Sequence, residues 1–117
     1  EMMLSSELPK IILNSAAPKA KEILARKRID ISAIKHWALH PGGRAILDSL
    51  QNGLALSDEQ LKPSREVLRN FGNLSSVSIL FVLKNLLENV ELKKDDYLCA
   101  IAFGPGLTME LVLFKVA

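Results

Sequence analysis

Three short segments rich in glycine, proline or asparagine interrupt the apolar pattern of this chain and limit the folds that it can adopt. They are residues 40–43 (His-Pro-Gly-Gly), 72–76 (Gly-Asn-Leu-Ser-Ser) and 103–106 (Phe-Gly-Pro-Gly). Glycine and proline punctuate regular structure, so each segment is expected to end a strand or to precede a helix. The chain is thereby divided into short strands and helices that follow one another closely.

The segments between these breaks predict an α/β domain. Strands are expected at residues 34–40, 97–103 and 108–116, with a short apolar piece at 2–4. Helices are expected at 44–52, ended by Gly53, at 64–71, with Pro63 near its start, and from 73–76 to 89. Residues 8–24 show helical spacing, and Pro18 is expected to kink or break them. This order predicts one domain over residues 1–117, a mixed β-sheet with helices packed on it.

The helix that follows residue 76 has an unusual pattern. Its first half, residues 77–83, is apolar nearly all round. A helix of that kind is expected to be buried on most sides. We therefore expect a layer between two sheets, one of which lies outside this chain.

Composition excludes several classes of function. A net charge of +2 and an aromatic content of 5% argue against nucleic-acid binding. Cys99 is the single cysteine, so a disulfide framework and a multi-cysteine zinc site are excluded. A reducing, cytoplasmic setting fits best. No apolar run approaches the roughly 20 residues of a membrane-spanning helix.

Each polar residue near the breaks also has a structural interpretation. His40 follows a strand and Asn73 precedes a helix, where ligands often bind, but where a histidine is often structural and an asparagine is often a cap. His36 and Trp37 are expected to be packed residues. Cys99 lies in an apolar strand and is expected to be an inert thiol. Residues 93–96 (Lys-Lys-Asp-Asp) are expected to form a solvated loop.

Together with the residues around them, the three segments form longer motifs that point to a family. Residues 40–48 read His-Pro-Gly-Gly-Arg-Ala-Ile-Leu-Asp, 65–76 contain Arg-Glu-Val-Leu and Phe-Gly-Asn-Leu-Ser-Ser, and 102–110 read Ala-Phe-Gly-Pro-Gly-Leu-Thr-Met-Glu. In order and spacing they resemble three motifs of the type III polyketide synthases, the chalcone and stilbene synthase family. The resemblance covers essentially the whole chain. His-Pro-Gly-Gly argues against a ketoacyl synthase of the fatty-acid type, which usually carries a His-Gln-Ala-Asn segment there.

The resemblance implies the C-terminal half of a thiolase-like fold. The family is a homodimer that condenses an acyl-CoA starter with malonyl-CoA, without a metal or other cofactor. Its active site is a Cys-His-Asn triad, in which His40 matches the histidine and Asn73 the asparagine. The nucleophilic cysteine belongs to the N-terminal half, and Cys99 does not match it. The chain alone is therefore expected to be inactive.

Further residues are implied by the same resemblance. Phe103, Gly104, Pro105 and Gly106 match a loop that shapes the floor of the substrate cavity. Ser75 matches a pocket residue, Ala45 lies near the CoA tunnel, and Met2 falls where plant enzymes have a phenylalanine that gates the tunnel. Because Met2 and Ala102 depart from the family pattern, the starter, the number of extensions and the product stay open.

Two functions of different classes remain at this point. The first is the C-terminal part of a type III polyketide synthase, which is catalytic when joined to the cysteine-bearing half. The second is a stand-alone, non-catalytic thiolase-fold half that binds a partner or an acyl-CoA without turnover. The lack of a matching nucleophile favours the second for the chain alone, whereas His40 and Asn73 in intact motifs favour the first for its parent.

Overall fold

A computed structural model of the chain describes residues 8–73, 77–103 and 108–117. Met2, Ser75, Gly104, Pro105 and Gly106 lie outside these residues. The elements are α1 (Leu8–Ile11), a π-helical turn (Ile12–Ala16), α2 (Ala17–Arg26), a 3₁₀ turn (Ile31–Ala33), β1 (Ile34–Leu39), α3 (Arg44–Leu54), α4 (Asp58–Phe71), α5 (Ser78–Asn89), β2 (Tyr97–Phe103) and β3 (Met109–Lys115).

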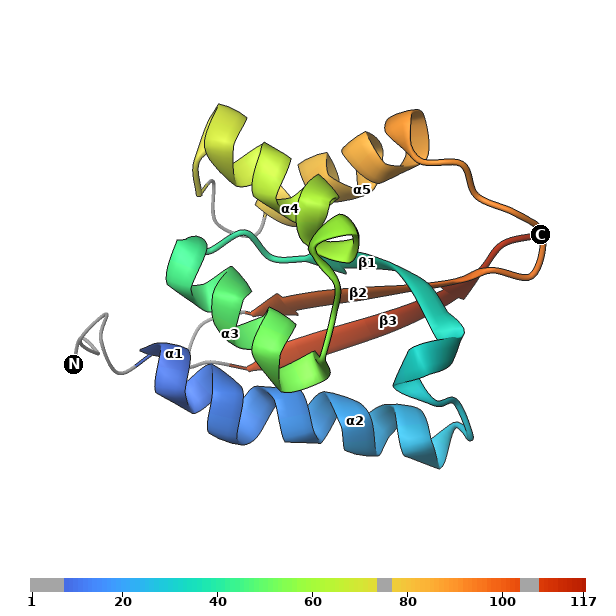
Figure 1. Cartoon of the computed structure of the whole chain (residues 1–117), viewed down its shortest axis with the longest axis horizontal. Coiled ribbons are helices and arrows are strands. Elements are labelled where there is room, and N and C mark those ends of the chain that lie inside the picture. Colours follow the sequence, from blue (N-terminus) through green and yellow to red (C-terminus); the bar gives the residue numbers. More distant parts are fainter. Residues whose placement is uncertain (1–7, 74–76, 104–107) are drawn as a thin grey trace.

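The three strands form one mixed sheet in the order β1-β2-β3 (Figure 1). β1 is parallel to β2, with Trp37 opposite Cys99, and β2 is antiparallel to β3. The predicted mixed sheet with helices packed on it is confirmed, and the strand ends lie within one residue of the expected positions. Parallel pairing of β1 and β2 brings their carboxyl ends to the same edge of the sheet.

Alternate residues of the strands enter two separate cores. Trp37 and Cys99 face α2 and α3, in a cluster whose largest side chains are fully buried. Ala38 and Ala100, one residue along each strand, face α5. The helix α4 lies beside β1 and contributes side chains to both clusters (Figure 1). This alternation is the period of two that a strand imposes on its side chains.

Two helices are longer than predicted. α3 continues through Gly53 to Leu54, which is fully buried, so the burial of a leucine offsets the cost of about 1 kcal/mol for a glycine in a helix. α4 begins at Asp58 rather than at residue 64, because Ser57 and Gln60 form a capping box, and Pro63 lies inside the helix. Both predicted bounds were wrong.

The first helical segment changes its hydrogen-bonding pattern rather than stopping at Pro18. A π-helical turn leads directly into α2, and Pro18 lies in the first turn of that helix. Proline is tolerated there because the first N–H groups of a helix have no partner within it. The expected irregularity is present, and it lies just before the proline.

The helix α5 is less buried than predicted. Val82 and Leu86 face the sheet and are fully buried, but Leu80 and Leu87 are 63% and 62% exposed. The reason is that the described residues that pack on the helix, from the sheet and α4, cover one side of it, and its opposite side faces outward. Among the described residues, no helix is long and apolar enough to cross a membrane.

Candidate active site

His40 directly follows β1, where the backbone turns sharply into α3. Its N–H donates to the Ile101 carbonyl of β2 at 2.9 Å, and its own carbonyl accepts from the Gly42 N–H at 2.9 Å. A Cβ atom at Gly42 would lie 3.2 Å from the His40 Cδ2 atom. Gly43, with a φ of 151°, begins the helix in a conformation that favours glycine. The two glycines therefore let the turn close over the imidazole ring.

The imidazole of His40 is buried without a charged partner. His40 is 8% exposed, and its Nδ1 atom has no hydrogen-bond partner among the residues that the structure describes. Burial lowers the pKa of His40 below its ordinary value of 6.5, and a hydrogen bond with the Asn73 side chain opposes that shift in part. A lowered pKa keeps the ring neutral at pH 7, when it can donate one hydrogen bond and accept another.

Asn73 reaches the same place from a distant part of the chain. It follows Gly72, which ends α4 with a φ of 72°, a backbone conformation that glycine adopts readily. The Asn73 side chain hydrogen-bonds the His40 side chain, and its Nδ2 atom makes a long contact of 3.5 Å with the Gly42 carbonyl. Asn73 is exposed, so a hydrogen-bonding amide lies between the buried histidine and the surface.

Two other predicted residues belong to α3 and β2. Ala45 is exposed in the first turn of α3. Phe103 ends β2 and is half-buried. It lines a cavity of about 290 Å³ between the end of the sheet and the first helical segment, together with Ile11, Ser15, Ala16, Lys19, Thr108 and Met109. Neither His40 nor Asn73 lines that cavity.

His36, which lies within β1, has a different environment. The His36 Nε2 atom lies 3.0 Å from Asp96 Oδ2, the Lys93 N–H donates to the same oxygen at 2.9 Å, and the Lys35 Nζ atom lies 3.5 Å from Oδ1. The hydrogen bonds from His36 and Lys93, with the charge of Lys35, lower the pKa of Asp96 to about 2. Asp96 is buried, so the predicted solvated loop at 93–96 is wrong at this residue, whereas the packed His36 is confirmed.

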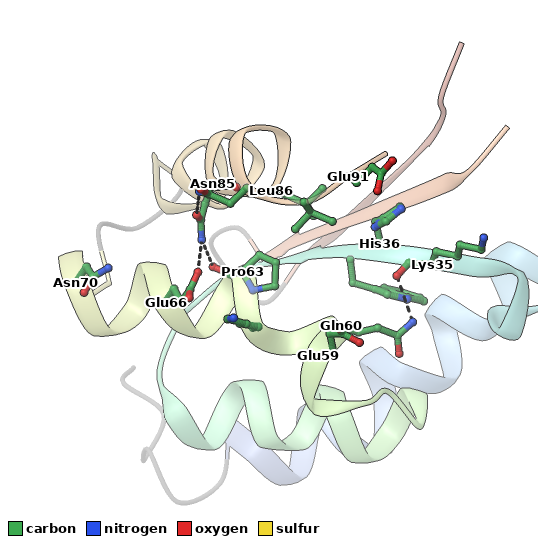
Figure 2. Close-up of a pocket in the computed structure, with 14 residues that line it drawn as sticks. Lys35, His36, Glu59, Gln60, Pro63, Glu66, Asn70, Asn85, Leu86 and Glu91 are labelled. Carbon is green, nitrogen blue, oxygen red and sulfur yellow. Dashed lines mark hydrogen bonds between the residues drawn. The ribbon is translucent and has the colours of Figure 1, made fainter. Parts of the chain in front are cut away.

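A groove of about 760 Å³ begins near this histidine and runs between α4 and α5 (Figure 2). Two of its polar side chains bond each other. The Asn85 Nδ2 atom of α5 donates to the Glu66 carboxylate and to the Pro63 carbonyl of α4, both at 3.1 Å, so these bonds join the two helices across the groove. His40 and Asn73 do not line it.

Cys99 is unsuited to act as a nucleophile. It is fully buried in β2, and burial raises the pKa of its thiol to about 12. The reactive form of cysteine is the thiolate, which is scarce at neutral pH when the pKa is so high. Among the residues that the structure describes, no cluster of three potential metal ligands occurs. The described part of the chain therefore supplies a histidine and an amide, but no reactive thiol.

Comparison with solved structures identifies the class of protein. The chain superposes on two type III polyketide synthases, which are thiolase-like structures. For PKS-I of the brown alga Ectocarpus siliculosus the TM-score is 0.86 at 34% identity, over 98% of this chain and 32% of that one. For 1,3,6,8-tetrahydroxynaphthalene synthase of Streptomyces coelicolor the TM-score is 0.88 at 28% identity, over 100% and 34%.

The sequence comparisons agree with the structures. The profile described as "Chalcone and stilbene synthases, C-terminal domain" matches residues 1–117. An alpha-pyrone synthesis polyketide synthase-like protein of Mycobacterium tuberculosis is 40% identical over 97% of this chain and 29% of its own length. Type III polyketide synthase B of Arabidopsis thaliana is 37% identical over 96% and 31%. The chain belongs to the chalcone and stilbene synthase family, as its C-terminal domain, and spans about a third of the length of these relatives.

Proposed function

We propose that the chain is the C-terminal part of a synthase that joins an acyl-CoA starter to malonyl-CoA by decarboxylative Claisen condensation. One observation carries this proposal: a buried imidazole, held neutral by its lowered pKa, is hydrogen-bonded to the side-chain amide of Asn73. Both groups can donate hydrogen bonds to one oxygen atom. Two such donors in a partly buried site form an oxyanion hole.

His40 and Asn73 donate hydrogen bonds when negative charge develops on the thioester oxygen. The C–C bond to the malonyl carboxylate breaks, CO₂ leaves, and the electron pair passes onto the thioester oxygen as an enolate. His40 and Asn73 donate to that oxygen and stabilise the enolate. The enolate carbon then attacks the carbonyl of an acyl group held on a cysteine, and the thiolate leaves. One cycle lengthens the acyl chain by two carbons.

The nucleophilic cysteine is proposed to come from an N-terminal half joined to this domain. Cys99 is excluded by its burial and high pKa. The outer side of α5 and the neighbouring side of β3 carry exposed apolar residues that a second layer would cover, and these are Val77, Leu80, Leu87, Val112 and Phe114. Exposed apolar surface of this kind usually marks an interface. The proposal includes a cytoplasmic homodimer of the complete synthase, as the family resemblance implies.

The test compares the chain alone with the complete synthase that carries it. CO₂ release from malonyl-CoA is followed with a set of acyl-CoA starters. We expect CO₂ release and a lengthened acyl product from the complete synthase. We expect no lengthened product from the isolated chain, because the acyl group has no thiol to receive it. Absence of CO₂ release from a folded complete synthase with every starter would overturn the proposal, and turnover by the pure chain would overturn the assignment of the nucleophile.

A second candidate is a stand-alone half that binds acyl-CoA without turnover. The buried and unreactive Cys99 favours it for the chain in isolation. Calorimetric titration with malonyl-CoA, and the intact mass of the native protein, separate the two. Binding by a native protein with a mass near 12.9 kDa would favour the second candidate.

A further inference from the structure

The end of β1 is held from both sides, although only one side has a neighbouring strand. Consecutive N–H groups of a strand point in opposite directions. The His40 N–H points toward β2 and bonds the Ile101 carbonyl. The Leu39 N–H points away from β2 and donates to the Ser64 hydroxyl oxygen at 3.0 Å. The serine thus takes the place of a missing strand at the residue before His40.

Ser64 is well placed to hold the strand rigidly. It is fully buried on α4, and the helix is tied to its surroundings on both sides. Arg65 donates to Asp48 of α3 at 2.7 Å, and Glu66 accepts from Asn85 of α5 at 3.1 Å (Figure 2). A hydroxyl on a helix anchored in this way has little freedom to follow movements of the strand.

We propose that Ser64 is a positioning residue for His40, an inference that rests on the proposed function. Among the described residues, the imidazole has no carboxylate to orient it, and its Nδ1 atom has no partner. Apart from the hydrogen bond with Asn73, its position therefore depends on the backbone that carries it. Without the hydroxyl, the Leu39 N–H is left buried and unpaired, and the end of β1 moves to find another partner. A catalytic group displaced by about 1 Å can lose up to about 100-fold in rate.

The chain offers a matched control on the same helix. The Gln60 side chain donates to the carbonyls of Ile34 and Lys35 at 3.3 and 3.4 Å, at the opposite end of the same strand edge. Gln60→Ala removes a bond between α4 and β1, as Ser64→Ala does, but it does so far from His40. Ser64→Thr keeps the hydroxyl and serves as the rescue variant.

The experiment measures kcat and KM for malonyl-CoA decarboxylation by the complete synthase and its three variants. We expect Ser64→Ala to lower kcat by about 10- to 100-fold while KM stays within about twofold, because the proposal concerns transition-state alignment rather than binding. Ser64→Thr and Gln60→Ala should keep kcat within about threefold of the wild type. An unchanged kcat in Ser64→Ala, or an equal loss in Gln60→Ala, would overturn the proposal.

A second readout separates this inference from the proposed function. The pKa of His40 is measured by NMR with labelled histidine, together with hydrogen exchange of the Leu39 amide. In Ser64→Ala we expect faster exchange at Leu39 and a His40 pKa raised toward its ordinary value, with neither change in Gln60→Ala. If the wild type releases no CO₂, the proposed function fails while this readout still decides the inference. If Ser64→Ala does not fold, Ser64→Cys, which is close in size and a weak acceptor, takes its place.

Discussion

The two histidines at β1 show how environment divides one residue type between two roles. His36 lies within β1, and His40 follows its last residue, Leu39. His36 meets the buried carboxylate of Asp96 at 3.0 Å, with Lys35 nearby. The His40 side chain is hydrogen-bonded to the amide of Asn73, and its Nδ1 atom has no partner in the described part of the chain. A histidine bonded to a carboxylate is tied into the structure, whereas one that is buried beside an amide keeps a neutral ring available for chemistry.

The largest expected difference between His36 and His40 is their effect on enzymatic activity. His40→Ala should lower malonyl-CoA decarboxylation by the complete synthase about 10²- to 10³-fold, since an oxyanion donor is lost. His36→Ala should change the rate by about twofold or less, because this side chain is bonded to Asp96 and is not part of the His40–Asn73 pair. Initial rates of CO₂ release measure both effects. Equal losses in the two variants would remove the distinction between the histidines.

The pH dependence of the same reaction tests the charge on His40. Burial places its pKa below the ordinary 6.5, so the neutral form persists as the pH falls to that value. We expect the wild-type decarboxylation rate to hold from about pH 8 to 6.5 and to decline only at lower pH. A decline centred above pH 6.5 would contradict a neutral, buried donor.

An intermediate effect is expected from Gly42→Ala. The new Cβ atom would lie 3.2 Å from the His40 Cδ2 atom, so the ring must shift by a few tenths of an ångström. We expect about a tenfold loss in decarboxylation, with little change in the thermal unfolding midpoint, because the φ of Gly42 is accessible to alanine. Wild-type activity in Gly42→Ala would show that close packing over the ring is not needed.

The smallest effect on activity, and a distinct effect on stability, is expected from Asp96→Asn. The pKa of Asp96 is depressed to about 2 from 3.8, chiefly by the hydrogen bond from His36. Its charged form therefore stabilises the native state above about pH 4, and this contribution is lost as the pH falls toward 2. Urea unfolding between pH 5 and 2 should show a steeper loss of stability in the wild type than in Asp96→Asn, and parallel curves would contradict the depressed pKa.

Much of the fold follows from local signals. The His-Pro-Gly-Gly segment ends β1 within a residue of its predicted end, because proline and glycine act through their own backbone geometry. The bounds of α3 and α4 were wrong where distant packing outweighed local preference. Leu54 extends α3 because it is buried, and Leu61, a fully buried residue of α4, stabilises a helix that runs through Pro63.

The sequence likewise predicted some residues of the candidate site and missed others. His40 and Asn73 were selected from the motifs around them, and their contact is visible only in the structure, since 33 positions separate them in the chain. Ser64 and Asp96 were missed. Ser64 has no local signal of its contact, because its partner Leu39 lies 25 residues earlier, and Asp96 meets His36 across 60 residues.

The sequence by itself determined the family, the alternation of short strands and helices, and the residue types at the candidate site. These properties reside in single segments, where backbone preferences and motif spacing act over a few residues. Only the tertiary structure decided which of the two histidines at β1 has a carboxylate partner, and which serine holds the end of that strand. Burial and charge pairing depend on groups brought together from distant positions, and no local segment contains both partners.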